Sequence, residues 1–171
     1  MQPFDYRRAF SRNIGWITEH EQSTLRDKRV AIAGMGGVGG FHLLTLARLG
    51  IGKFNIADLD KFEVENFNRQ AGAVISSVGE PKVDVLAHMA CDINPEAEIS
   101  VFPHGVNAQN LDEFFRDVDL YIDGLDFFAF DARERVFAYC SEHRIPAVTV
   151  APLGMSAALL NFLPGQMTFE D

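Results

Sequence analysis

A short polar stretch that begins at Asp58 holds the side chains with the clearest chemical use. Asp58 and Asp60 come first, and Asn66, Arg69 and Gln70 follow within ten residues of Asp60. A carboxylate can accept hydrogen bonds from ribose hydroxyls, and the fixed guanidinium fork of Arg suits phosphate oxygens. We therefore interpret the stretch as part of a nucleotide site. One acid suffices for a nicotinamide dinucleotide, so the second acid is either a further ligand or a solvated carboxylate in a turn.

Three further charged side chains favour a triphosphate as the ligand. Lys82 lies at the start of a predicted helix, where its ammonium group can bind phosphate as a point charge. Arg12 is another candidate cation, and Asp126 ends a predicted strand and would face the ligand crevice. A triphosphate needs this extra positive charge and a metal such as Mg²⁺, which takes one or two carboxylates plus phosphate oxygens. Each cation alone could equally be a surface charge, but their joint placement favours a nucleotide.

A glycine loop precedes this stretch. Gly34, Gly36 and Gly39 form the pattern G-x-G-x-x-G, with Gly37 inside it. The glycines allow a tight turn and a close approach of backbone to phosphate, whose charge meets the N-terminus of the helix that follows. The motif alone also fits a structural turn, an alternative that Gly37 and Gly40 strengthen. Its position between a buried apolar run and a helical pattern favours nucleotide binding without naming the nucleotide.

Strands and helices alternate along the chain. Apolar, β-branched runs predict strands at 29–34, 53–60, 97–103, 119–126 and 146–152. Apolar residues at helical spacing predict helices at 38–50, 80–94, 110–118 and 131–143, and residues 155–165 are a further strand candidate. The alternation predicts an α/β fold with a Rossmann-like doubly wound, mainly parallel sheet, helices on both faces and ligands at the carboxyl ends of the strands. We expect one domain over residues 1–171, with an N-terminal helical segment at about 1–28 and a core at about 29–165.

The composition excludes several classes of protein. Hydrophobic residues make up 47% of the 171 residues, which predicts a folded domain. No apolar run reaches the ~20 residues that span a bilayer, and the first residues do not form a signal peptide, so we expect a cytoplasmic protein without a membrane partner. The net charge of −9 makes nucleic acid an unlikely partner, because phosphate binding needs a positive field. Cys91 and Cys140 lack metal-like spacing and are interpreted as reduced, structural thiols.

Several motifs occur together in a recognisable order. The chain contains "SRN" at 11–13, "GMGGVGG" at 34–40, "LGIGKFNIADLDKFEVENFNRQ" at 49–70, "GEPKVD" at 79–84 and "DLYIDGLD" at 119–126. This succession resembles the ThiF/MoeB family of adenylating enzymes, which are related to the ubiquitin-activating enzymes. The resemblance covers almost the whole chain, and the order of Asp-x-Asp, Asn-x-x-Arg-Gln and Gly-x-x-Lys makes it specific.

The resemblance implies an activity and partners. The family binds ATP and Mg²⁺ and adenylates a carboxylate, usually the C-terminus of a small sulfur-carrier or ubiquitin-like protein or a peptide. The carboxylate attacks the α-phosphorus, so an acyl-adenylate and pyrophosphate form without a protein nucleophile. Arg12 matches the arginine that the family supplies to the ATP of a neighbouring subunit, which implies a homodimer.

The same resemblance implies roles for individual residues. ATP and its metal would be held as follows: Gly34, Gly36, Gly37 and Gly39 admit the nucleotide, Asp58 and Asp60 lie at the ribose, Asn66, Arg69 and Gln70 surround the phosphates, Lys82 holds the α-phosphate and Asp126 binds Mg²⁺. Phe67, which lies among the polar residues, is expected to anchor the stretch in the core.

The sequence departs from the family at two points. Phe127 replaces the usual Asn after Asp126, and the Cys-x-x-Cys zinc pairs of many relatives are missing, so no zinc site is expected. The chain therefore resembles a minimal or C-terminally truncated domain. Three alternatives remain: a non-catalytic nucleotide- or partner-binding domain of a larger enzyme, a nicotinamide-dependent oxidoreductase, which would leave Asn66, Arg69 and Lys82 idle, and, within the family, an RNA substrate.

Overall fold

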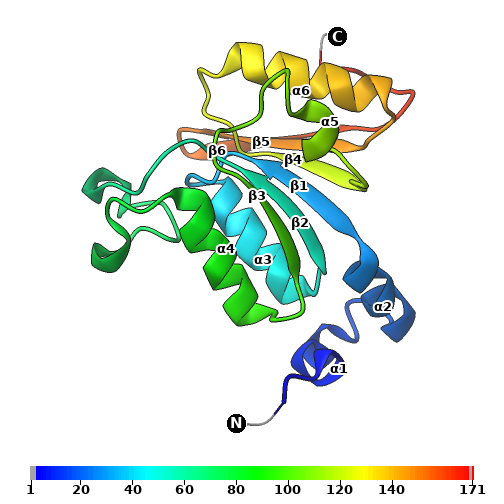
Figure 1. The fold of residues 1–171 in the computed structure, drawn as a ribbon. Helices are drawn as coiled ribbons and strands as arrows, with labels where there is room; N and C mark the ends of the chain where they lie inside the picture. The colour runs from blue at the N-terminus through cyan, green and yellow to red at the C-terminus, as the bar shows by residue number, and fades with distance from the viewer. Residues whose placement is uncertain (1–2, 170) are drawn as a thin grey trace.

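The computed structural model describes residues 3–169 and 171, and a single six-stranded sheet dominates it (Figure 1). The strand order is β3-β2-β1-β4-β5-β6. The strands are β1 (Arg29–Ala33), β2 (Lys53–Ala57), β3 (Glu98–Phe102), β4 (Leu120–Asp123), β5 (Ala147–Leu153) and β6 (Ser156–Phe162). Neighbouring strands from β3 through β5 pair in parallel, whereas β6 pairs antiparallel with β5. The predicted doubly wound, mainly parallel sheet is confirmed.

The strand order reverses at β1, which pairs with β2 on one side and β4 on the other. In open α/β sheets, such a reversal leaves a crevice at the carboxyl ends of the two central strands, where ligands bind. Ala33, the last residue of β1, lies opposite Ala57 of β2 and Asp123 of β4. The segments that follow these three strands therefore meet at one edge, the carboxyl edge of the sheet.

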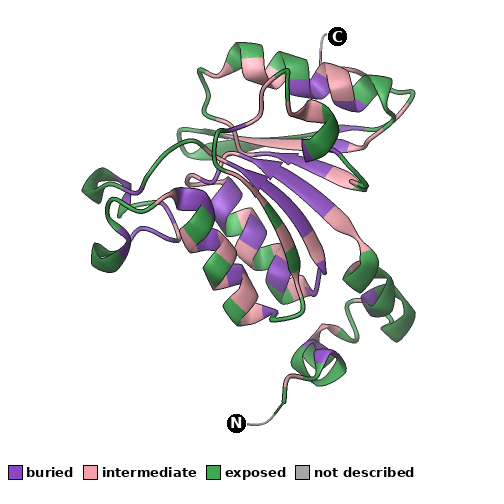
Figure 2. Cartoon of the chain, in the orientation of Figure 1, coloured by how far each residue is buried: buried purple, intermediate pink, exposed green. Residues whose placement is uncertain are grey.

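Helices cover both faces of the sheet (Figure 1). On one face lie α3 (Gly39–Leu49) and α4 (Lys82–Ile93), and on the other lie α5 (Leu111–Phe114) and α6 (Phe130–Glu142). Successive side chains of β1 serve the two cores: Val30 and Ile32 pack with α3 and α4, whereas Ala31 and Ala33 pack with α5 and α6. The central strands are buried on both faces in Figure 2, which explains their continuous apolar sequences.

The N-terminal segment forms α1 (Tyr6–Ala9), the 3-10 helix η1 (Ser11–Asn13) and α2 (Glu19–Asp27). Thr18 and Glu21 form a capping box at the start of α2. The Tyr6 hydroxyl donates a hydrogen bond of 2.6 Å to the carbonyl of Gly50, directly after α3. A crossover helix runs back along the sheet, so this contact places the N-terminal segment at the amino edge, away from the crevice.

The structure changes several details of the predicted elements. Residues 155–165 contain the antiparallel strand β6, and the helix predicted at 110–118 shortens to the four residues of α5. Residues 58–81 form an irregular excursion with two 3-10 helices, η2 (Val64–Asn66) and η3 (Ile75–Ser77). The expected core position of Phe67 is wrong: 40% of the residue is exposed, because the excursion projects from the sheet (Figure 1). None of the described helices is long and apolar enough to cross a membrane.

Candidate functional site

The glycine loop meets the segment after β4 through backbone alone. Gly34 has a φ of +88°, which favours glycine, and a Cβ on it would overlap the carbonyl oxygen of Gly124. A Cβ on Gly39 would overlap the carbonyl oxygen of Gly34. The first and third glycines of the motif are therefore required by the close packing of strand, turn and helix at the crevice.

The other two glycines face the polar stretch. An added Cβ would lie 3.8 Å from Gln70 Nε2 at Gly36, and 3.3 Å from the Arg69 carbonyl oxygen at Gly37. The structure thus brings the glycine loop and the Arg69–Gln70 pair together. Gln70 is buried, and its Oε1 has no hydrogen-bond partner among the described residues. Buried polar atoms are normally satisfied, so a hydroxyl or amine of a bound ligand would complete this site.

The two acids after β2 have different environments. Asp58 accepts a hydrogen bond from the Met35 amide through one carboxylate oxygen and from the Asp60 amide, at 2.8 Å, through the other. Both oxygens therefore bind backbone and join the glycine loop to the turn after β2. The side chain of Asp60 is 57% exposed, so Asp60 is the acid with a carboxylate that a ligand can reach.

Lys82 forms an ion pair with Asp60 at the N-terminus of α4. The Nζ–Oδ2 distance is 3.0 Å, and the Lys82 side chain is only 7% exposed. An ammonium group has three donors, so Lys82 can keep Asp60 and still donate to a phosphate oxygen. The proximity of this acid and this base is a property of the fold, because the Lys82 amide also donates to the Asp60 carbonyl at 3.0 Å.

Asn66 and Arg69 lie on opposite sides of the same turn. Asn66 is buried and accepts a hydrogen bond of 3.0 Å from the Glu63 amide, which shapes the turn. The exposed Arg69 guanidinium donates to the Glu65 carbonyl and to Asn68 Oδ1, each at 3.0 Å. Arg69 keeps further donors that a phosphate could use, whereas the Asn66 oxygen is committed to the turn.

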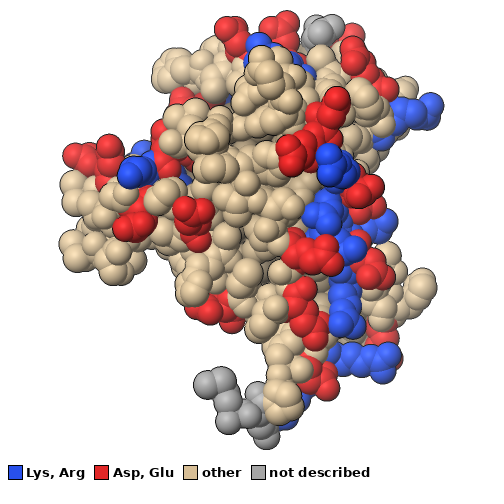
Figure 3. Space-filling model, in the orientation of Figure 1, with Lys and Arg blue, Asp and Glu red and all other residues tan. Residues whose placement is uncertain are grey.

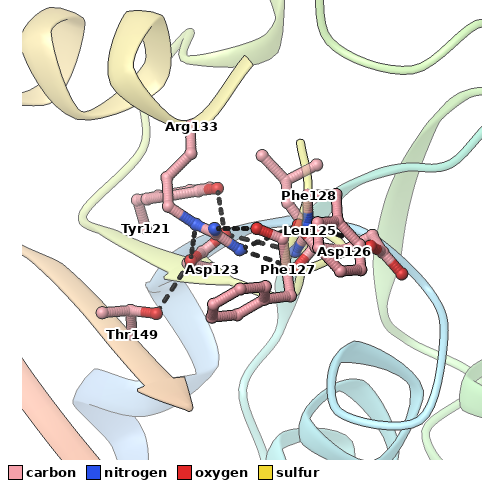
Figure 4. A network of polar contacts seen from close by, with 8 residues as sticks. All are labelled: Tyr121, Asp123, Leu125, Asp126, Phe127, Phe128, Arg133 and Thr149. Carbon is pink, nitrogen blue, oxygen red and sulfur yellow. Dashed lines mark hydrogen bonds and ion pairs between the residues drawn. The ribbon is translucent and has the colours of Figure 1, made fainter. Parts of the chain in front are cut away.

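A buried ionic network supports the segment after β4 (Figure 4). Arg133 of α6 donates from Nε to Asp123 Oδ2 at 2.8 Å, and the Asp123 side chain is 1% exposed. Thr149 donates to the same oxygen at 2.8 Å, while the Leu125 amide donates to the other carboxylate oxygen at 3.2 Å. Burial, followed by the charge of Asp123, raises the pKa of Tyr121 well above its ordinary value, so its hydroxyl stays a donor to Asp123.

Arg133 also holds the backbone that carries Asp126. Its Nη2 donates to the carbonyls of Leu125 at 2.8 Å and Asp126 at 3.2 Å, and its Nη1 donates to that of Phe127 at 3.3 Å. Sequence reasoning missed Asp123 and Arg133. The available signals were a carboxylate at the end of a buried apolar strand and a cation one helical turn into the next helix.

Asp126 is the candidate metal ligand. Asp126 is exposed at the carboxyl edge, and its Oδ1 accepts a hydrogen bond of 3.1 Å from the Phe128 amide. No group of three or more His, Cys, Asp and Glu side chains is arranged to hold a metal ion in residues 3–169 and 171. A single carboxylate fits Mg²⁺ that arrives with phosphate oxygens and waters, and it does not fit a metal held by protein alone.

One predicted site residue, Arg12, lies elsewhere. Arg12 is next to Asn13, whose Nδ2 donates to the Leu49 carbonyl at 3.1 Å, at the amino edge. The length of α3, about 16 Å at 1.5 Å per residue, separates this point from the glycine loop, so Arg12 does not join the site of its own chain.

Burial raises the pKa of the Cys140 thiol to about 12, which leaves it protonated and unreactive.

Basic side chains do not form a broad positive surface on the face shown in Figure 3, where they are interleaved with acids. Along the amino edge, Arg26 pairs with Glu96 at 2.7 Å, and Lys28 pairs with Asp119 at 2.7 Å. Although burial raises the pKa of Asp119, the hydrogen bonds from the Arg29 amide and Lys28 outweigh it and lower the pKa overall. Each of these two cations therefore has an acidic partner at the amino edge.

Comparisons with known proteins show relatives of this sequence and this fold. The chain is 35% identical over 141 residues to a tRNA threonylcarbamoyladenosine dehydratase of Bacillus subtilis (strain 168), covering 82% of this chain and 55% of that protein. It is 32% identical to a protein HesA of Leptolyngbya boryana, covering 94% of this chain and 57% of that protein. The structure of the E. coli tRNA N6-threonylcarbamoyladenosine dehydratase in complex with ATP matches with a TM-score of 0.79 at 31% identity, covering 84% of this chain and 58% of that chain.

The chain thus spans little more than half the length of these relatives. A family model described as "ThiF family" matches residues 10–171 of this chain. Because this match includes the glycine loop, the polar stretch and the segment after β4, the chain belongs to the ThiF family.

Proposed function

We propose that this chain is an ATP-dependent adenylating domain that transfers AMP to a carboxylate and releases pyrophosphate. The observation that carries the proposal is the gathering of the glycine loop, Gln70, the Asp60–Lys82 pair and Asp126 at one carboxyl edge. A nicotinamide dinucleotide would use the glycine loop and one acid but would leave the buried Lys82 without a role. Similarity to an ATP complex also supports ATP.

The residues have distinct roles in this mechanism. Gly36 and Gly37 let the nucleotide approach the backbone, and Asp60 accepts bonds from the ribose. Lys82 donates to the α-phosphate, where negative charge grows as the carboxylate attacks, and catalysis consists of positioning and charge stabilisation. When bound with ATP at Asp126, Mg²⁺ would neutralise part of the phosphate charge.

Asn66, Arg69 and Gln70 complete the phosphate side of the site. Arg69 supplies the guanidinium, and the amides of Asn66 and Gln70 shape the wall next to the glycine loop. Adenylation requires no thiol, because the carboxylate attacks the α-phosphorus directly. Burial raises the pKa of Cys91 and raises that of Cys140 to about 12, which keeps both thiols protonated near neutral pH. The absence of Asn after Asp126 is compatible with adenylation in this proposal because Arg133 fixes the local backbone instead.

Arg12 acts in trans in this proposal. Its place at the amino edge excludes its own site, and a two-fold dimer would bring it to the partner's phosphates. Arg12→Ala and Lys82→Ala should each lower exchange by roughly 10²–10³-fold alone. Mixed dimers of the two variants should recover activity, because one of their two sites would carry neither lesion. Verified mixed dimers that stay inactive would refute the shared site.

Two observations bear on the acceptor. The relatives named as tRNA threonylcarbamoyladenosine dehydratases favour a tRNA-linked carboxylate over the expected ubiquitin-like or sulfur-carrier protein. The net charge of −9 favours a polypeptide carboxylate over nucleic acid. We retain the carboxylate as the reacting group and test both acceptor classes, together with a non-catalytic role.

ATP–pyrophosphate exchange tests the proposal directly. Purified chain is incubated with ATP, Mg²⁺ and labelled pyrophosphate, with tRNA, small sulfur-carrier proteins or peptides as acceptors. Lys82→Ala should lower exchange by roughly 10²–10³-fold, as expected for a lost charge-stabilising donor. Lys61→Ala, an exposed cation of the same segment, is the matched control and should retain exchange.

Two outcomes would overturn the proposal. One is stabilisation of the fold by NAD but not by ATP and Mg²⁺, which would indicate an oxidoreductase. The other is ATP binding with no exchange for any acceptor class, which would favour the non-catalytic domain.

A further inference from the structure

Three phenylalanines are exposed together after β4. The exposed fractions are 57% for Phe127, 82% for Phe128 and 53% for Phe130. The ring of Phe127 contacts both others edge-to-face, with centroid distances of 5.3 Å to Phe128 and 5.7 Å to Phe130. Edge-to-face contacts leave ring faces open to solvent. We call these three side chains the phenylalanine platform.

The platform rests on fixed backbone. Arg133 binds three successive carbonyls, those of Leu125, Asp126 and Phe127, while its ion pair with Asp123 anchors it in the interior. Figure 4 shows this arrangement, with Phe127 and Phe128 directly beside the network. A buried ion pair therefore holds a segment whose apolar side chains face water, and exposed apolar clusters of this kind mark interaction sites.

The platform also lies at the mouth of the proposed nucleotide site. It follows Asp126 directly, and Gly124 of the same segment touches the glycine loop. An acceptor that brings a carboxylate to the α-phosphate must pass close to this segment. The group that flanks the carboxylate is then the part of the acceptor that the rings contact.

Local charge selects the kind of acceptor. Residues 58–82 and 124–131 contain seven acidic and three basic side chains, a formal excess of four negative charges at this edge. Bound ATP would add more. This excess disfavours a second polyanion beside the bound nucleotide, whereas an apolar side chain is unaffected, and basic residues farther along a polypeptide would be attracted.

We propose that the phenylalanine platform binds a polypeptide acceptor through an apolar or aromatic residue next to its C-terminal carboxylate, with basic residues upstream. This inference rests on the proposed adenylation. It assigns the specificity of the acceptor to Phe127, Phe128 and Phe130 and leaves the chemistry to the nucleotide site.

Fluorescence anisotropy tests the binding without requiring turnover. The probes are labelled basic peptides that end in Phe or in Ser with a free carboxylate, the Phe peptide with an amidated end, and a single-stranded oligoadenylate. Binding is measured to the whole chain in the presence of AMP. The Phe peptide should bind about tenfold more tightly than the Ser peptide, the size expected for one or two aromatic contacts.

Variants identify the surface. Phe128→Ala and Phe130→Ala change exposed side chains and should fold normally, yet each should remove most of the preference for Phe. Leu159→Ala is the matched control, because Leu159 is 61% exposed on β6, and it should keep the preference. Circular dichroism and thermal melts confirm that the variants are folded.

The platform would be refuted by equal affinity for the Phe and Ser peptides, by no peptide binding, or by a preference for Phe that neither variant changes. It would also be refuted if oligoadenylate bound more tightly than the Phe peptide in a Phe128-dependent way, which would assign the rings to nucleobases. The proposed function fails separately. Peptide binding that depends on Phe128, without pyrophosphate exchange, would support the platform and refute adenylation. Peptide-dependent exchange that is unchanged in Phe128→Ala and Phe130→Ala would support adenylation and refute the platform.

Discussion

Removal of the Arg133 side chain should destabilise the fold strongly. In Arg133→Met, the Asp123 carboxylate stays buried without its cation, since its side chain is 1% exposed. Breaking one partner of a buried ion pair typically costs about 3–5 kcal/mol. Thr149, the Leu125 amide and Tyr121 still donate to Asp123, so we expect a loss near the lower limit, about 3 kcal/mol. That is a large share of the roughly 5–15 kcal/mol that stabilises a typical domain.

Related variants separate charge from geometry. Arg133→Lys keeps the cation, but one ammonium group cannot serve Asp123 and three carbonyls together, so we expect a loss of about 1–2 kcal/mol. Asp123→Asn combined with Arg133→Met removes both charges. The loss of unfolding free energy in the double variant should be at least ~1 kcal/mol smaller than the sum of the losses in the two single variants, because neither partner is left as an unpaired buried charge.

Urea denaturation followed by circular dichroism measures these losses as shifts in the midpoint at constant slope. Arg135→Met is the matched control on the same helix: Arg135 is exposed, and the change should stay within about 0.5 kcal/mol. A loss below 1 kcal/mol in Arg133→Met, or strict additivity in the double variant, would refute the account of a buried, coupled pair.

Three further predictions follow from packing and titration. Gly39→Ala should destabilise the fold by more than about 2 kcal/mol in urea, because its methyl group overlaps backbone, whereas Gly36→Ala, with its nearest neighbour at 3.8 Å, should cost less than about 1 kcal/mol. The double variant Cys91→Ala and Cys140→Ala should keep pyrophosphate exchange, and native Cys140 should resist alkylation at pH 8, since its pKa is about 12; loss of exchange in a folded double variant would disprove this. Because the pKa of Asp119 is lowered in the folded state, its contribution to stability is complete above the ordinary carboxyl value of 3.8 and is lost as the pH falls through the folded value. Asp119→Asn should therefore reduce the loss of folding free energy at acid pH. An unchanged dependence of stability on acid pH would contradict this role of Asp119.

Sequence pattern predicted the parts of this molecule that depend on local order. Apolar runs separated by helical segments specify a parallel sheet, and the turn after β1 is visible as glycines. The sequence also assigned Asp60 and Lys82 to one nucleotide site, although it did not predict the ion pair between them. These features require only that each strand ends where its apolar run ends.

Contacts between distant segments were beyond the pattern. Asp123 and Arg133 meet because α6 begins over the end of β4. The sequence showed a carboxylate at the strand end and a cation in the next helix, but not that the two side chains pair. Asp58 was expected at the ribose, and the pattern did not reveal that its oxygens also bind the Met35 and Asp60 amides. Phe67 looked like a core residue, but an excursion without sheet pairing leaves its side chain exposed.

The buried network and the glycine contact depend on each other. Gly34 and Gly124 approach so closely that neither can carry a side chain, so the segment after β4 has no anchor of its own at the crevice. Arg133 supplies that anchor from the opposite side through three carbonyls. Backbone contact within the crevice and side-chain support behind it fix the segment at both surfaces. Asp126 and the phenylalanine platform are thereby held at the mouth of the candidate site, where the proposed mechanism brings the nucleotide and the acceptor together.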